Sequence, residues 1–239
     1  MPEGIYAAAA GMAAQQAQMD ALSNDIANVN TAGYKSERTG FKDLVYAAEH
    51  GMPVGAGAAV VDMGRTSAQG ALTPTGDPLD VAISGPGYIQ VKRADGSIAL
   101  TRDGQLQIDA NGALTIQSGE RLQPPITLPK GTDPQSISIA QDGTVNVAGK
   151  AVGKVTIVDV PAPSALLSSG DNLFTPTAGS GAPVAVQGAT LTQGSVEASN
   201  VDLASAMTDL IQAQRSYELA SRAIQTQDQL LDIANQIVK

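Results

Sequence analysis

The sequence predicts an α+β protein in which an antiparallel β-rich body is inserted between two long terminal helices. Three observations lead to this prediction. Apolar residues recur every seven positions near both chain ends, short alternating segments fill the middle, and Asp-Gly and Asn-Gly dipeptides separate those segments. A spacing of seven residues between apolar positions is typical of helices that pack along a seam. Alternation of apolar and polar residues is typical of strands.

The N-terminal region reads as one helix that ends near residues 30–33. Its apolar seam has a main row seven apart and a second row beside it: Ile5, Met12, Met19 and Ile26, with Ala8, Leu22 and Val29. Asn30 and Thr31 weaken the helix, and Gly33 accepts the positive φ that often follows a last turn. Between Ile5 and Val29 the only charged residues are Asp20 and Asp25. A solvated helix normally carries more charge, so we expect this one to be packed on more than one side.

The C-terminal region reads as a second, longer helix, with Ser199 and Asn200 as candidate N-caps. No Pro or Gly occurs after these two residues. The residues of its apolar seam again lie seven positions apart: Leu203, Leu210, Tyr217, Ile224, Leu231 and Val238. Small residues beside this seam allow close helix approach. The simplest partner is the N-terminal helix, so the two are expected to pair as a coiled coil.

The predicted domains are a helical domain of residues 1–33 and 199–239, a connector of residues 34–71, and a β-rich body of residues 72–198. The connector is rich in Gly and small residues and is expected to be extended or loosely structured. Within the body, turn dipeptides at Asp95-Gly96, Asp103-Gly104 and Asn111-Gly112 lie eight residues apart and predict an antiparallel meander of hairpins.

The composition argues against nucleic-acid binding, catalysis and metal or cofactor binding. The formal net charge is −9, and the densest basic group, Lys35, Arg38 and Lys42, is interrupted by acidic residues, so nucleic-acid binding is not expected. The chain has no Cys and one His, His50, which is expected to be a surface residue without a catalytic or metal-binding role. Its acidic residues fit turn positions better than a calcium loop, and no dinucleotide-binding pattern follows a strand. We therefore expect no enzyme activity, no cofactor and no metal.

The N-terminus lacks the basic and apolar regions of a secretory leader, and no apolar run is long enough to span a membrane. Terminal helices with apolar surface on several faces, attached to a compact body, are typical of a subunit that polymerises. Such subunits associate through heterologous contacts that do not form a closed ring, which builds a tube or helical filament. The predicted assembly residues are Ile5, Met12, Met19, Leu22, Ile26, Val29, Leu203, Leu210, Tyr217, Ile224 and Leu231. A rival interpretation is a secreted binding protein with a helical stalk.

The residues also resemble a known family. The segment ALSNDIANVNTAGYKSERTGFKDL is similar to the N-terminal motif of the bacterial flagellar rod and hook proteins, and the blocks PLDVAISGPGYIQV and GSVEASNVDLASAMTDLIQAQRSYELASRAIQTQDQLL are similar to later parts of that family. The matching motif residues are Asn24, Asp25, Ile26, Ala27, Asn28, Thr31, Gly33, Tyr34 and Lys35. Asp25 departs from the family pattern at the second residue of its Asn pair.

The resemblance implies a structural subunit of the flagellar rod, most similar to distal-rod members, with a proximal rod subunit as the alternative. It further implies a helical drive shaft in the periplasm, exported without a cleaved signal peptide. The implied partners are copies of the same chain, other rod proteins, the hook, the ring bushing and the flagellar export apparatus.

Overall fold

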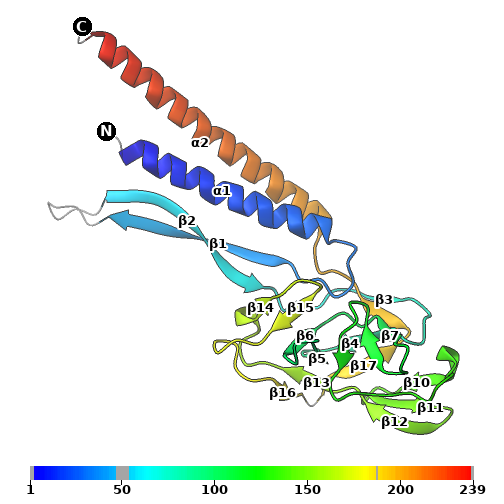
Figure 1. Ribbon diagram of the computed structural model, residues 1–239. Helices are drawn as coiled ribbons and strands as arrows, with labels where there is room; N and C mark the ends of the chain where they lie inside the picture. Colours follow the sequence, from blue (N-terminus) through cyan, green and yellow to red (C-terminus); the bar gives the residue numbers. More distant parts are fainter. Residues whose placement is uncertain (1–2, 47–53, 187, 238–239) are drawn as a thin grey trace. The chain divides into compact units, whose positions relative to one another are not determined.

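The computed structural model describes residues 3–46, 54–186 and 188–237 (Figure 1). The chain divides into two compact units. We call residues Met1–Ala27, Glu37–Met63 and Asp202–Lys239 the helical unit, and residues Asn28–Ser36 and Gly64–Val201 the body unit. His50 lies outside the described residues. No helix in the described part of the chain is both long and apolar enough to cross a membrane.

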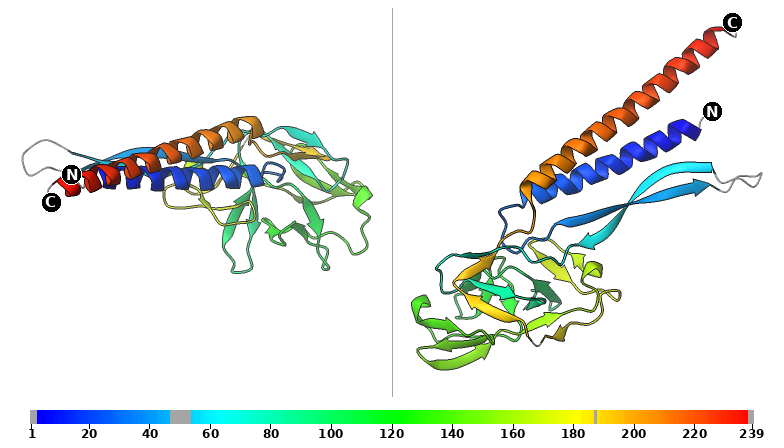
Figure 2. Two further views of the ribbon diagram at one scale, coloured as in Figure 1. Left: turned by 90° about the horizontal axis from the view of Figure 1, so that it is seen from above. Right: turned by 180° about the vertical axis from the view of Figure 1, so that it is seen from behind.

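The helical unit contains both predicted helices. Helix α1 spans Glu3–Ala27 and helix α2 spans Leu203–Ile237. The two lie side by side and run in opposite directions (Figures 1 and 2). The side chains buried within this unit are small or short: Ala14 and Asp25 on α1, and Ala206 and Ala213 on α2. Small residues on facing surfaces let helix axes approach closely.

The helical unit also contains a two-stranded sheet, formed by β1 (Glu37–Tyr46) and β2 (Val54–Arg65). Both strands lie within residues 34–71, where the sequence predicted an extended or loosely structured connector. Their pairing was not predicted, because the glycines and alanines of β2 give no clear alternation of apolar and polar residues.

The predicted start of the C-terminal helix was wrong by a few residues. The N-cap of α2 is Asp202, whose Oδ1 accepts the backbone N–H of Ser205 at 2.7 Å. This bond lowers the pKa of the Asp202 carboxyl group. Ser199 and Asn200 precede the helix, and Asn200 makes long-range bonds instead. By contrast, Gly33 has the predicted positive φ, +69°.

The body unit is built from short strands. They are β3 (Leu72–Pro74), β4 (Val81–Ser84), β5 (Tyr88–Lys92), β6 (Ile98–Thr101), β7 (Leu106–Ile108), β8 (Leu114–Ile116), β9 (Arg121–Leu122), β10 (Ile137–Ile139), β11 (Thr144–Val147), β12 (Lys150–Lys154), β13 (Ile157–Asp159), β14 (Leu167–Ser168), β15 (Leu173–Thr175), β16 (Val184–Ala185), β17 (Thr190–Gln193) and β18 (Ser195–Glu197). Two 3₁₀ turns, Pro134–Ser136 and Pro163–Ala165, interrupt them.

The largest sheet has nine strands, and its main path has the order β14-β15-β6-β5-β9-β8-β7. Strands β10, β11 and β12 form a separate sheet, β17 pairs with β4, and β18 pairs with β3. These pairings are antiparallel, as predicted. The main apolar core consists of side chains from many of these strands and includes Ile89, Leu114, Val145 and Leu191.

Two of the three evenly spaced turn dipeptides form hairpins. Asp95-Gly96 joins β5 to β6, and Asn111-Gly112 joins β7 to β8. The hairpin predicted at Asp103-Gly104 was wrong. Strand β6 pairs with β5 and β15 instead of β7, and the N–H of Val81 donates to the carbonyl of Gly104 at 2.9 Å. This dipeptide is therefore a close crossing inside the body.

Candidate functional site

Three charged side chains meet in the interior of the body unit. Lys35 and Glu197, 162 positions apart, form an ion pair between Nζ and Oε1. Arg102 Nη1 donates to the other carboxylate oxygen, Oε2, at 3.1 Å. The Glu197 side chain has no exposed surface, and those of Lys35 and Arg102 are 2% and 4% exposed. We call these three residues the junction cluster.

The cluster is completed by backbone groups. Glu197 Oε1 also accepts the N–H of Gly70 at 2.9 Å, Lys35 Nζ donates to the carbonyl of Ala68 at 2.7 Å, and Arg102 Nη2 donates to that of Gly85 at 3.0 Å. Arg102 Nε has no hydrogen-bond partner in the described part of the chain. A single carboxylate therefore serves two buried cations.

This imbalance sets the electrostatics of the cluster. Burial lowers the pKa of Lys35, because a desolvated ammonium is disfavoured, while the hydrogen bond and charge of Glu197 oppose that effect. The Arg102 guanidinium also lies 5.3 Å from the ring centroid of Tyr88, where the aromatic face offers a weaker attraction. Glu197 is thus the only carboxylate bonded to either cation among the described residues.

The end of the family motif is part of this cluster. Gly33 donates its N–H to the carbonyl of Glu197 at 2.7 Å, and Tyr34 and Lys35 are buried. Upstream, Thr31 Oγ1 donates to Asn28 Oδ1 at 3.2 Å. The motif's last residues therefore belong to the body unit.

The first half of the motif lies in the helical unit. Asn24, Asp25, Ile26 and Ala27 form the last turn of α1. Asp25, the departure from the family pattern, is buried, and its Oδ1 accepts the N–H of Glu37 at 3.1 Å. The aspartate therefore connects the end of α1 to the start of β1.

Two further side chains lie beside the junction cluster. Asn200 Oδ1 accepts the N–H of Ser36 at 2.8 Å, and its Nδ2 donates to the carbonyl of Ala68 at 2.9 Å. Arg65 Nη1 donates to the carbonyl of Lys35 at 2.7 Å, and its guanidinium lies 5.0 Å from the ring centroid of Tyr34. Sequence patterns did not predict Arg65, Arg102, Glu197 or this role of Asn200, because no spacing links residues so far apart in the chain.

The predicted assembly positions are mostly half-buried. This holds for Met12, Met19, Leu22, Ile26, Val29, Leu210 and Ile224. Leu203 and Tyr217 remain exposed, and the side chains of Ile5 and Leu231 lie outside the described ones. Their role in assembly stays a prediction.

Helix α2 presents apolar side chains on a second face. Leu203, Met207 and Ile211 are 41%, 49% and 50% exposed and stand four residues apart. At about 100° per residue, this row lies away from the face that buries Ala206 and Ala213. Further exposed apolar residues of the helical unit are Tyr6, Phe41, Leu44, Val61, Met63, Leu219, Leu230 and Ile233.

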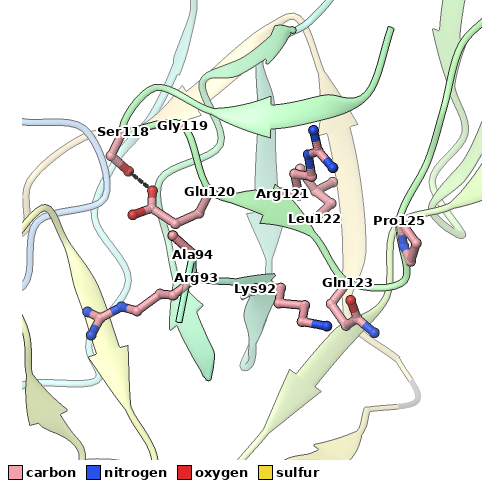
Figure 3. Close-up of a pocket in the computed structure, with 10 residues that line it drawn as sticks. All are labelled: Lys92, Arg93, Ala94, Ser118, Gly119, Glu120, Arg121, Leu122, Gln123 and Pro125. Carbon is pink, nitrogen blue, oxygen red and sulfur yellow. Dashed lines mark hydrogen bonds between the residues drawn. The ribbon is translucent and has the colours of Figure 1, made fainter. Parts of the chain in front are cut away.

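The body unit also contains a hollow of about 680 Å³ lined by Lys92, Arg93, Glu120 and Arg121, among others (Figure 3). The cationic side chains point in different directions (Figure 3). Arg121 Nη2 is bonded to Asp109 Oδ2 at 3.0 Å, and Ser118 donates to Glu120. Because these groups do not converge, the hollow has no arrangement suited to one ligand. The described residues also include no group of three or more potential metal ligands.

Comparison with known proteins settles the family. Three family models match separate segments: "Flagella basal body rod protein" over residues 5–35, "Flagellar hook protein FlgE/F/G D1 domain" over residues 82–147, and "Flagellar basal body rod FlgEFG protein C-terminal" over residues 192–237. The chain is 40% identical to the flagellar basal-body rod protein FlgG of Agrobacterium fabrum, covering 97% of this chain and 98% of that protein.

The chain belongs to the flagellar basal-body rod protein family. The FlgG of Borreliella burgdorferi is 37% identical over 99% of both chains. Two rod proteins of Caulobacter vibrioides allow a comparison within one organism: FlgG is 36% identical over 98% of this chain, and FlgF is 32% identical over 93%. The family and these full-length FlgG matches identify a structural subunit of the flagellar rod, of the distal type.

The junction cluster and the exposed row on α2 both lie in segments that the family models match. The junction cluster lies where the N-terminal motif meets the C-terminal segment matched by the rod model, because Lys35 ends the first match and Glu197 lies near the start of the last. The exposed row on α2 lies inside that last match as well.

Proposed function

We propose that this rod subunit assembles with copies of itself through its two terminal helices, which pair as a coiled coil and form the inner wall of a tubular drive shaft. The β-rich body forms the outer layer, and the shaft transmits torque from the motor to the hook. In this scheme residues 34–71 connect the layers. The subunit contributes structure and no chemistry.

One observation carries this proposal. The helical unit has apolar surface on two sides, since α2 buries alanines on one face and exposes Leu203, Met207 and Ile211 on another. Fully burying one such large side chain contributes about 1.5–3 kcal/mol. A row of them, on a helix whose partner α1 carries few charges, favours contact with further helices over exposure to water.

The proposed partners follow from the rod location. They are copies of this chain along the shaft, other rod proteins and the hook at its two ends, the ring bushing around it, and the export apparatus that delivers subunits. The rod location itself places the subunit in the basal body, and we propose that it works in the periplasmic part.

The test is the concentration dependence of assembly. Full-length protein is followed by sedimentation velocity and by helical circular dichroism, alongside Leu210→Asp and Ile26→Asp. We expect the wild-type chain to form large particles and gain helical signal as concentration rises. Both variants should keep a folded body but stay small, because an unpaired carboxylate is costly to bury. A wild-type chain that remains monomeric and fully helical at high concentration would contradict the proposal.

A further inference from the structure

The last stretch of the body unit, residues 190–200, supplies the strand partners of two much earlier strands. Among the described strands, β4 pairs only with β17, and β3 pairs only with β18. Strand β4 lies in the interior, since Val81, Ala82 and Ile83 are each 1% exposed. Without β17, the backbone groups of β4 that face it would be buried and unpaired, which is strongly disfavoured. We call residues 190–200 the closing segment.

Side chains of the closing segment bind other parts of the body unit as well. Leu191 is 1% exposed and belongs to the main apolar core. Gln193 Nε2 donates to the carbonyls of Pro78 at 2.6 Å and Ile137 at 2.9 Å, and Gln193 Oε1 accepts the N–H of Ile139 at 3.1 Å. The segment therefore holds together β10 and the turn that precedes β4.

The charge of Glu197 adds a second requirement. Lys35 and Arg102 precede it in the chain, Lys35 by 162 positions, and both are bonded to its carboxylate. If the body closed without Glu197, it would bury two cations with no carboxylate bonded to either among the described residues. An unpaired buried charge is costly, so the closed arrangement is disfavoured until Glu197 is in place.

A strand at the edge of a sheet has no such requirement, and β14 is the example within the same unit. Its two residues, Leu167 and Ser168, are both exposed. Its partner β15 also pairs with β6, so β15 would keep a strand partner if β14 detached. The closing segment differs because the strands that it covers have no second partner.

We infer that the closing segment sets the order of folding, because the body unit does not fold without it. A chain that is still being synthesised therefore stays open until residues 190–200 have been made, when only residues 201–239 remain. Motif residues that are buried in the finished body, such as Tyr34 and Lys35, stay accessible until then. This inference concerns the single chain and does not depend on assembly.

The experiment measures amide hydrogen exchange of the folded, full-length chain at increasing urea concentrations. A body that can stay folded without the closing segment would release that segment in a local opening, which exchanges its amides faster than those of the remaining sheet. Gly194 and Ala198 report on the closing segment, and Leu114 and Ile116 report on the nine-stranded sheet. All four amides are hydrogen-bonded. We expect all four to exchange through one common opening with one urea dependence.

The amide of Ser169 is the internal control. It donates to the carbonyl of Leu173 at 2.9 Å in the hairpin of β14 and β15. Because β14 is an exposed edge strand, this amide should exchange faster and with a weaker urea dependence. Its behaviour shows that the measurement detects a local opening where one occurs.

Two neighbouring substitutions in β17 complete the test. Leu191→Ala removes a buried side chain and should speed exchange by about tenfold or more. The increase should be the same at Leu114 and Ile116 as at Gly194 and Ala198. The matched control is Thr192→Ala, whose parent side chain is exposed and which should leave all four rates within about twofold.

Two results would overturn the inference. The first is faster exchange of Gly194 and Ala198 than of Leu114 and Ile116 in the parent chain, since the sheet would then persist while the closing segment is detached. The second is an effect of Leu191→Ala that is confined to the closing segment. Neither result depends on whether the chain polymerises, so the proposed function is tested separately.

Discussion

Gly33 packs directly against the backbone of Arg102. A Cβ atom added to Gly33 would lie 2.6 Å from the carbonyl carbon of Arg102 and 2.6 Å from the nitrogen of Asp103. The φ angle of Gly33, +69°, is also one that residues with side chains rarely adopt. Glycine is therefore required at position 33 for two separate reasons: the backbone has a positive φ, and there is no room for a side chain.

We predict that Gly33→Ala destabilises the body unit by more than the roughly 1–2 kcal/mol that a left-handed φ costs by itself. The control is Gly96→Ala, where φ is +85° but no atom lies within 4 Å of the added Cβ. Urea unfolding of both full-length variants measures the difference. Equal losses would show that the backbone of Arg102 can move aside.

Substituting different residues of the junction cluster should lower the folding stability by different amounts. Glu197→Gln leaves two buried cations without a carboxylate, and breaking a buried pair in this way costs about 3–5 kcal/mol. Lys35→Met removes the surplus cation and retains the bond between Arg102 and Glu197, so it should cost much less. Chemical denaturation at neutral pH compares the two. A larger loss for Lys35→Met would contradict this account of the charge balance.

Asp103 should make stability depend on pH in mildly acidic solution. Burial raises its pKa above 3.8, the bond from the N–H of Gln105 opposes this, and the nearby charge of Asp80 adds to it. A raised folded-state pKa means that the contribution is fully present below the unfolded pKa and is lost as pH rises through the folded one. Asp103→Asn, which keeps an oxygen for Gln105, should therefore raise stability at pH 7 and flatten this part of the profile.

The control for that profile is Asp95→Asn. Bonds from Ser97 lower the pKa of Asp95, so its ionised form stabilises the turn above the unfolded pKa and the contribution is lost as pH falls. This substitution should lower stability at pH 7. Thermal melts of both variants across the acidic range should thus show shifts of opposite sign, and shifts of the same sign would be evidence against burial as the cause.

The exposed row on α2 gives a prediction about assembly. Met207→Asp should leave the isolated chain folded, because the side chain is half exposed, but should block polymer formation and motility. Met207→Leu keeps an apolar side chain of similar volume and should assemble as the parent does. Sedimentation and swimming assays of the two variants provide the comparison. Normal motility with Met207→Asp would remove this face from the proposed interface.

Local patterns predicted the features that depend on neighbouring residues. The two long helices, the positive φ of Gly33 and the hairpins at Asp95-Gly96 and Asn111-Gly112 each follow from residues a few positions apart. The same kind of reasoning failed at Asp103-Gly104, because the pairing of β6 with β15 involves residues far along the chain. It also failed at Ser199 and Asn200, both reasonable N-caps, because Asn200 is bonded to Ser36 and Ala68.

The sequence by itself determined the helix–body–helix order and, through its motif, the membership of the rod family. Only the tertiary structure decided that Lys35 and Glu197 meet, 162 positions apart, with Arg102 on the other carboxylate oxygen. The physical reason is the sequence separation over which each kind of interaction acts. Helical periodicity and turn chemistry act over a few residues, whereas a buried ion pair requires partners that only the packed fold brings within bonding distance.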